Sequence, residues 1–125
     1  MKKLFNTFNP VLKVIELDEY TFRNFINDRF SVVEFYSDFC PYCRILTRML
    51  EPLCEEIGVN GGKINVGKYR NIGREYEIEL VPTVIVFSEG NAVGGFTGLT
   101  SSMNAKKELL RLAEKYGNED HSCCF

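Results

Sequence analysis

Phe39-Cys40-Pro41-Tyr42-Cys43 decides how this sequence folds, because it places two cysteines at the junction of a predicted strand and a predicted helix. Residues 30–36, which precede it, are rich in β-branched and aromatic side chains, as buried strands are. In residues 44–57, which follow it, leucines and an isoleucine recur every three or four positions and predict a helix with one apolar stripe. The two thiols therefore lie at a turn from strand to helix.

The place of each thiol in this turn has chemical consequences. Proline is tolerated as the first residue of a helix, so Pro41 puts Cys40 just outside the first turn and Cys43 just inside it. Backbone N–H groups at a helix start are unpaired and the helix dipole is positive there, so a Cys40 thiolate is stabilised and its pKa falls. Because Cys43 can reach back to Cys40, we predict a dithiol–disulfide exchange centre.

The bulk composition limits the classes of protein to which this chain can belong. Its 125 residues are enough for one domain with a core, and 45% hydrophobic residues are typical of a globular protein. A net charge of −2 with mixed signs favours neither nucleic acid nor an anionic membrane as a partner. No apolar run reaches about 18 residues and no signal-peptide core follows Met1-Lys2-Lys3, so we expect a cytoplasmic protein.

The rest of the chain alternates between predicted strands and helices, which indicates an α/β fold. Further strands are expected at 11–17, 63–66, 82–87 and 92–96, with a loop at 58–62 and a turn at 88–91. Further helices are expected at 19–26 after an Asp18 cap and after Ser101 or Ser102, and a short helix or turn is expected at 72–76. Residues 1–10 are predicted to be a loose arm, 11–117 the folded domain and 118–125 a polar tail.

Several stretches of this sequence resemble the thioredoxin family, in the family's order and at near-family spacing over residues 11–116. They are residues 33–43, Lys63-Ile64-Asn65-Val66, Val81-Pro82-Thr83, Gly90 and Phe96-Thr97-Gly98. The resemblance implies a thioredoxin fold, in which a central mixed sheet is flanked by helices on both faces and the active site lies at the start of the second helix. It also implies a protein-disulfide reductase that holds no cofactor of its own.

The resemblance gives roles to the residues around the cysteines. Cys40 is expected to be the nucleophile, as its place at the helix start also indicates, and Cys43 the resolving thiol. Glu34 is implied to be a buried carboxyl beneath them that relays the Cys43 proton, with Lys63 on the neighbouring strand as its partner. Strand alternation alone would instead allow Glu34 to face solvent.

Substrate binding is expected from residues next to the thiols and from two loops beside them. These residues are Phe39, Pro41, Tyr42, Val81, Pro82 and Gly98. The resemblance implies a cis Val81–Pro82 bond, which turns the Val81 backbone toward the sulfurs, where it can pair with an extended substrate chain.

Other features depart from thioredoxins. The dipeptide Pro41-Tyr42 is that of glutaredoxins, and Gly94-Gly95 is similar to their glutathione site, although the acidic residue that follows there is missing. Phe39 stands where thioredoxins usually have tryptophan, and the helix proline, Pro52, falls about one turn later. The alternatives are therefore a glutathione-dependent enzyme, or a protein whose Cys40 ligates an iron–sulfur cluster in a dimer.

The remaining cysteines carry weaker signals. Cys54 lies beside the apolar stripe and is predicted to be an inert core residue. His121, Cys123 and Cys124 could complete a zinc site with the CxxC pair, but adjacent cysteines fit a tetrahedral site poorly. We therefore expect a monomer without metal that acts on disulfide-containing proteins. Its electron donor would be a thioredoxin-reductase-like protein or glutathione.

Overall fold

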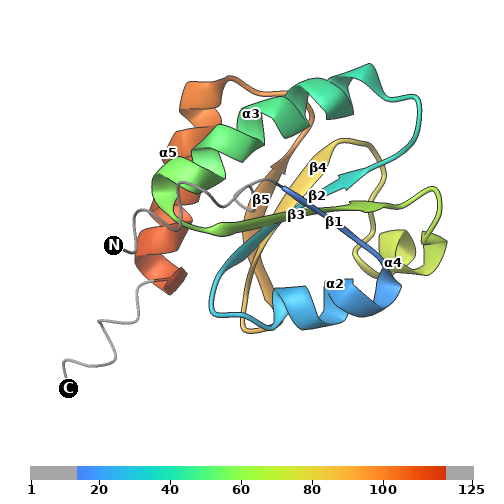
Figure 1. Cartoon of the computed structure of the whole chain (residues 1–125), viewed down its shortest axis with the longest axis horizontal. Helices are drawn as coiled ribbons and strands as arrows, with labels where there is room; N and C mark the ends of the chain where they lie inside the picture. The colour runs from blue at the N-terminus through green and yellow to red at the C-terminus, as the bar shows by residue number, and fades with distance from the viewer. Residues whose placement is uncertain (1–13, 118–125) are drawn as a thin grey trace.

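A five-stranded sheet runs through the centre of the computed structural model, which describes residues 14–117 (Figure 1). The strands are β1 (Ile15–Leu17), β2 (Ser31–Tyr36), β3 (Asn60–Asn65), β4 (Thr83–Ser88) and β5 (Asn91–Thr97). The helices are α2 (Glu19–Ile26), α3 (Pro41–Ile57), α4 (Arg70–Glu75) and α5 (Ser102–Leu112), and a π-helical turn η2 (Ala113–Gly117) continues α5.

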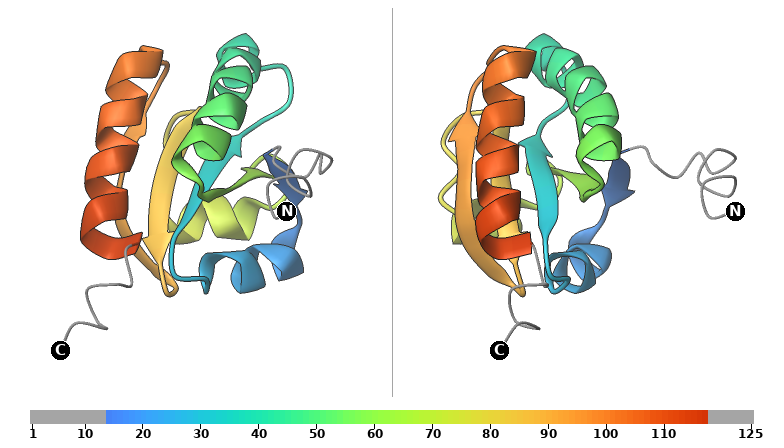
Figure 2. Two further views of the ribbon diagram at one scale, coloured as in Figure 1. Left: turned by 60° about the vertical axis from the view of Figure 1, so that its left-hand side comes forward. Right: turned by 90° about the vertical axis from the view of Figure 1, so that its left-hand side faces the viewer.

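The strand order explains why β2 can carry a central site. The order is β1-β3-β2-β4-β5; β1, β3 and β2 are parallel, and β4 is antiparallel to both β2 and β5. Helices α3 and α5 cover one face of this mixed sheet, and α2 and α4 cover the other (Figures 1 and 2). The predicted α/β architecture, with helices on both faces, is therefore confirmed.

Each face of the sheet has its own apolar core, because successive strand residues point to opposite faces. Val32 packs with Leu46 and Leu50 on the α3 side, whereas Val33 and Phe35 pack on the α2 side. The second core is strongly aromatic, with ring centroids 5.4–6.1 Å apart among Phe22, Phe35, Tyr76 and Phe87. The sheet thus separates two packed layers, and the residues beneath α3 belong to only one of them.

Local chemistry sets several element ends where the sequence predicted them. The Asp18 carboxylate accepts hydrogen bonds from the backbone N–H groups of Tyr20 and Thr21, which caps α2. Ser101 caps α5 through Asn104 N–H. Glu89 and Gly90 both have positive φ and join β4 to β5 in a two-residue turn.

One element boundary was predicted wrongly. β3 begins at Asn60, so Gly61 and Gly62 belong to the strand and not to a loop. The reason is close packing: a methyl group on Gly61 would lie 2.9 Å from Cys54 Sγ, and one on Gly62 would lie 2.8 Å from Leu17 Cδ1. Glycine here lets the helices approach the strand from both faces.

The start of α3 agrees with the sequence. α3 begins at Pro41, which was expected to be the first helical residue, and runs on through Pro52. Residues 11–13 of the first predicted strand, the predicted arm at 1–10 and the predicted tail at 118–125 lie outside the described residues. Within residues 14–117, no helix has both the length and the apolar character needed to cross a membrane.

Candidate dithiol active site

The two cysteines lie where β2 ends and α3 begins. Cys40 has an extended backbone and is the N-cap of α3, Pro41 is the first helical residue, and Cys43 lies in the first turn. In the sheet, Phe35 pairs with Thr83 and Thr83 with Thr97, so the end of β2 meets the start of β4 and the end of β5. The sheet therefore brings the predicted loop residues to the same edge as the cysteines.

The loop residues are tied together at this edge. Gly98 N–H donates to the Pro82 carbonyl over 2.7 Å, and the Val81–Pro82 peptide bond is cis, as expected. Thr83 Oγ1 donates to the Leu80 carbonyl over 2.6 Å, which holds the start of β4. The loops before β4 and after β5 therefore form one connected rim.

The two sulfurs are bonded to each other and differ in accessibility. Cys40 and Cys43 form a disulfide with their Cα atoms 5.2 Å apart. Cys43 N–H donates to Cys40 Sγ over 3.2 Å and also to the Cys40 carbonyl over 3.1 Å, so a backbone donor at the helix start faces the Cys40 sulfur. Cys43 is only 2% exposed, whereas Cys40 is partly exposed. An incoming molecule can therefore reach Cys40 and not Cys43.

Apolar side chains stand in solvent beside the disulfide. Phe39 is 94% exposed and has a left-handed backbone with φ 59°, and Tyr42 is 61% exposed. Leu80 and Leu99 lie on the same rim, are 54% and 43% exposed, and are not among the expected substrate-binding residues. Their only signal in the sequence is that each adjoins an expected substrate-binding residue.

Glu34 is completely buried beneath α3, so the solvent-facing alternative is wrong. Its Oε1 accepts a 2.6 Å hydrogen bond from Thr47 Oγ1, and its Oε2 has no hydrogen-bond partner among the described residues. Burial raises the pKa of Glu34 to about 7, although the Thr47 hydrogen bond and the Lys63 charge both lower it. The carboxyl can therefore gain or lose a proton near neutral pH.

Lys63 lies on the strand next to Glu34, as expected, and acts on that carboxyl through its charge rather than through an ion pair. It pairs in register with Glu34 on one side and Glu16 on the other, but its Nζ lies 4.0 Å from Glu16 Oε1 and makes no ion pair with Glu34. It also lies 5.2 Å from the centroid of the Tyr36 ring, and the Tyr36 hydroxyl donates to Glu16. Lys63 pairs with the partly exposed Glu16 and not with the buried Glu34, because its ammonium group keeps more of its hydration beside Glu16.

The double glycine serves packing. A methyl group on Gly94 would lie 2.8 Å from Leu112 Cδ1, so α5 rests directly on β5 at this point. Gly95 has φ 151°, and a methyl group on it would overlap the Val84 carbonyl oxygen. Both glycines thus have a reason within the fold, which weakens their resemblance to a glutathione site.

The other predicted thiol and metal residues lie apart from this site. Cys54 is buried in the α3-side core, and burial raises the pKa of its thiol to about 12, which agrees with an inert core residue. His121, Cys123 and Cys124 lie outside the described residues. Within residues 14–117, no three potential metal-ligating side chains come together.

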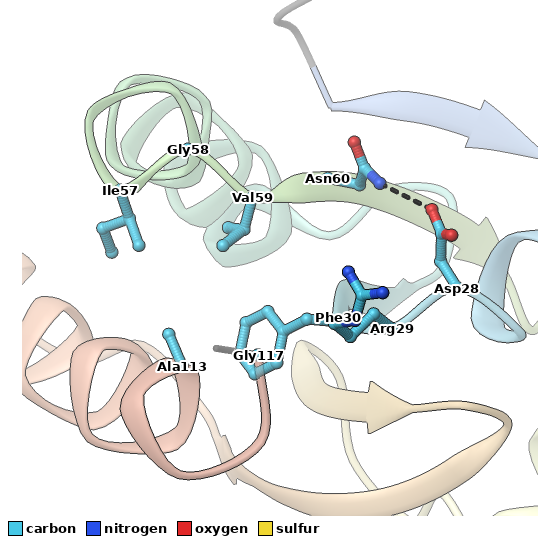
Figure 3. Close-up of a pocket in the computed structure, with 9 residues that line it drawn as sticks. All are labelled: Asp28, Arg29, Phe30, Ile57, Gly58, Val59, Asn60, Ala113 and Gly117. Atoms are coloured by element: carbon cyan, nitrogen blue, oxygen red, sulfur yellow. Dashed lines mark hydrogen bonds between the residues drawn. The ribbon is translucent and has the colours of Figure 1, made fainter. Parts of the chain in front are cut away.

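A cavity lies at the opposite edge of the sheet, where the parallel strands begin. It measures about 370 Å³ and is bounded by the end of α3, the start of β3 and η2 (Figure 3). Phe30, Ile57 and Val59 form its apolar part, and Asp28 accepts a 2.9 Å hydrogen bond from Asn60 at its rim. It shares no residue with the dithiol site.

Comparison with known proteins gives a consistent result. The family model described as Thioredoxin matches residues 13–111. A thioredoxin from Chlamydia pneumoniae is 36% identical over 107 residues, which cover 85% of this chain and 99% of that protein. Two solved structures have a similar fold, each with a TM-score of 0.75. One is a mutant thioredoxin from Halobacterium salinarum, with 21% identity and coverage of 81% of this chain and 91% of that one. The other is a thioredoxin from Trypanosoma brucei brucei, with 19% identity and coverage of 85% and 96%.

Proposed function

This chain belongs to the thioredoxin family, and from that membership we propose how its dithiol works and which partners it meets. It is a thiol–disulfide oxidoreductase; proteins of this family act on disulfide substrates and are themselves reduced by reductases. In our proposal Cys40 is the nucleophile and Cys43 the resolving thiol. The observation that carries this assignment is the unequal exposure of the two sulfurs, with Cys43 sealed and Cys40 reachable at the helix start.

The proposed cycle has two exchange steps. The Cys40 thiolate attacks one sulfur of a substrate disulfide, a Cys40–substrate disulfide forms, and the other substrate sulfur leaves as a thiolate. Cys43 then loses its proton and attacks the Cys40 sulfur. The Cys40–Cys43 disulfide forms and the second substrate sulfur leaves, so two electrons have passed to the substrate.

Glu34 is the proposed acceptor of the Cys43 proton. A general base works best when its pKa lies near the working pH, and burial brings the pKa of Glu34 to about 7. Lys63 contributes through its charge alone, which lowers the pKa of Glu34 and keeps part of the carboxyl ionised. We therefore assign Glu34 to proton transfer and Lys63 to tuning that carboxyl.

The rim around Cys40 is the proposed landing surface for the substrate polypeptide. Exposed Phe39 and Tyr42 offer apolar contact on either side of Pro41. The loop before β4, with Val81 and Pro82, and the loop after β5, with Gly98, present backbone beside the dithiol, as an extended substrate chain requires. Such a surface suits disulfide-containing proteins.

We propose a protein reductase as the electron donor. The glutathione-dependent and cluster-binding alternatives are not favoured, because the matching family and the named relative are thioredoxins. Gly94 packs against Leu112 and Gly95 against the β4 backbone. The acidic residue that follows the double glycine in glutaredoxins is missing here, and the loss of one polar partner weakens the binding of a charged tripeptide by about 1–3 kcal/mol. The protein would work as a cytoplasmic monomer, without a cofactor, and with neither nucleic acid nor membrane as a partner.

Cysteine variants test the assignment of the two thiols. Cys40→Ser should abolish reduction of insulin disulfides, whereas Cys43→Ser should accumulate a mixed disulfide through Cys40, detectable by mass spectrometry. Cys54→Ser is the matched control and should keep activity, because that thiol lies in the core. Faster alkylation of Cys43 than of Cys40 at mildly acidic pH would overturn the assignment.

Parallel donor assays test the proposed partner. The disulfide form should be reduced efficiently by thioredoxin reductase with NADPH and only weakly by glutathione with glutathione reductase. Robust turnover with glutathione and none with thioredoxin reductase would contradict the proposal.

A further inference from the structure

Thr47 stands between the buried carboxyl and the helix turn that carries Cys43. It lies on α3, one helical turn after Cys43. Its Oγ1 is 2.6 Å from Glu34 Oε1 and 2.8 Å from the Cys43 carbonyl oxygen. Within residues 14–117 this hydroxyl makes the hydrogen bond to Oε1, while Oε2 has no partner.

The two contacts compete for a single proton. A threonine hydroxyl has one hydrogen to donate but two lone pairs with which to accept. It therefore cannot donate fully to both the Glu34 carboxylate and the Cys43 carbonyl.

We propose that Thr47 is a positioning residue for proton transfer in this enzyme, holding the Glu34 carboxyl under α3 and turning its hydroxyl between Glu34 and the Cys43 carbonyl. This inference rests on the role of Glu34 in the proposed function. When Glu34 is ionised, Thr47 donates to it. When Glu34 has taken the Cys43 proton, the new carboxyl O–H donates to Thr47 Oγ1, and Thr47 donates to the Cys43 carbonyl.

The oxygen that faces Thr47 is thus hydrogen-bonded in both protonation states by a group of the protein itself. A buried carboxylate without its donor would bear the cost of an unsatisfied group. Through its contact with the Cys43 carbonyl, Thr47 also links the Glu34 carboxyl to the helix turn in which Cys43 lies.

Other charged groups act on Glu34 from the neighbouring elements. Lys63 on β3 lowers the pKa of Glu34, whereas Glu16 on β1 and Glu51 on α3 raise it. Thr47 differs from them because it touches the carboxyl, so its removal changes a hydrogen bond and leaves these charges in place.

Thr47→Val tests the inference, because valine has nearly the shape of threonine and lacks the hydroxyl. The first readout is the pKa of Glu34, measured by carboxyl-carbon NMR on the disulfide form. We expect Thr47→Val to raise it by about one pH unit, since a hydrogen bond to a charged group is worth that much. Thr47→Ser keeps the hydroxyl and should leave the pKa close to that of the wild type.

The second readout is the pH dependence of mixed-disulfide resolution in single turnovers. A rise of about one pH unit from a pKa of about 7 cuts the ionised fraction of Glu34 about fivefold at pH 7 and by only about a tenth at pH 9. Thr47→Val should therefore slow resolution about fivefold at pH 7 and hardly at pH 9. In a Glu34→Gln background the same substitution should have no pH-dependent effect.

The possible outcomes separate the two proposals. An unchanged pKa in Thr47→Val, or an equal shift in Thr47→Ser, would overturn the role of Thr47 while leaving that of Glu34 intact. If Glu34→Gln resolves mixed disulfides like the wild type, the proposed role of Glu34 fails, and that of Thr47 fails with it. Should Thr47→Val fold poorly, Thr47→Ala gives the same comparison at a site that is only partly buried.

Discussion

Glu34 is a residue at which stability and the proposed function oppose each other. Its pKa is about 7 in the folded chain against an ordinary value of 4.5, so the folded state holds its proton more tightly. Below about pH 4.5 the Glu34 carboxyl is protonated in both the folded and the unfolded chain, so the folded state bears no cost from burying its charge. As pH rises to about 7 the unfolded chain ionises first, and about 3 kcal/mol of stability is lost.

Glu34→Gln should therefore gain stability relative to the wild type as pH rises from 4 to 8, by up to about 3 kcal/mol. Urea unfolding at a series of pH values measures the difference. Glu55→Gln, on the exposed face of α3, is the control and should show no such trend. A difference that is flat with pH would mean that Glu34 titrates normally.

Glu16, Lys63 and Glu34 lie side by side on three neighbouring strands, and removing the charge of Glu16 or of Lys63 should shift the pKa of Glu34 in opposite directions. Lys63→Met removes a charge that lowers the pKa of Glu34, so that pKa should rise. Glu16→Gln removes a charge that raises it and also releases Lys63, so the pKa should fall. Carboxyl NMR on both variants checks the directions, and equal signs would show that the row does not act through charge.

At this scale the sequence predicts some site residues and misses others. Burial of Glu34 was predicted through the family resemblance, because strand alternation alone also allowed this residue to face solvent. Thr47 could not be predicted, because a threonine on a helix has no periodic signal and its partner, Glu34, is set by how α3 lies on β2. Lys63 was placed on the right strand, but its choice of Glu16 depends on exposure, which alternation does not give.

At the scale of elements, the contact of α5 with β5 depends on two glycines that should differ in their tolerance of a side chain. In Gly94→Ala the new methyl meets the end of the Leu112 side chain, which can move, at a cost of about 1–3 kcal/mol. In Gly95→Ala it meets the β4 backbone at φ 151°, so the loss should be at least about 3 kcal/mol.

Urea unfolding of these two variants measures the difference. Gly58→Ala is the control, because Gly58 has φ 84° with open space around it, and should cost only about 1 kcal/mol. Equal losses of unfolding free energy in Gly94→Ala and Gly95→Ala would show that the β4 backbone moves to accommodate the methyl group.

Element types were predictable where periodicity or capping was strong. Helix α2 with its Asp18 cap and the hairpin turn at Glu89-Gly90 follow from local sequence. The start of β3 could not be predicted from local sequence, because Asn60-Gly61-Gly62 has the composition of a loop. It forms a strand because side chains from both faces of the sheet pack closely against its glycines. Tertiary packing decides such segments, and a single sequence does not display it.

At the scale of the whole molecule, both cores draw on residues between Val14 and Tyr116. We therefore propose 11–117 as the folding domain, and removal of residues 118–125 should change the free energy of unfolding by less than about 0.5 kcal/mol. Reductase activity should also remain. Truncation before Leu112, which is buried against β5, is the destabilising control. A loss above about 1 kcal/mol on removing 118–125 would mean that the tail packs on the domain.

The roles that we propose for the two sulfurs, together with their unequal exposure, imply that the enzyme can repair itself. We expect small oxidants and thiol-capping agents to meet Cys40 in the reduced protein, because Cys43 is buried beneath the turn in the disulfide form. If Cys43 resolves mixed disulfides as we propose, it expels a cap joined through a disulfide, such as glutathione, in the same way as a substrate. A thioether cap has no sulfur–sulfur bond to break and is permanent. The protein should therefore recover from oxidative capping but be inactivated by a single alkylation.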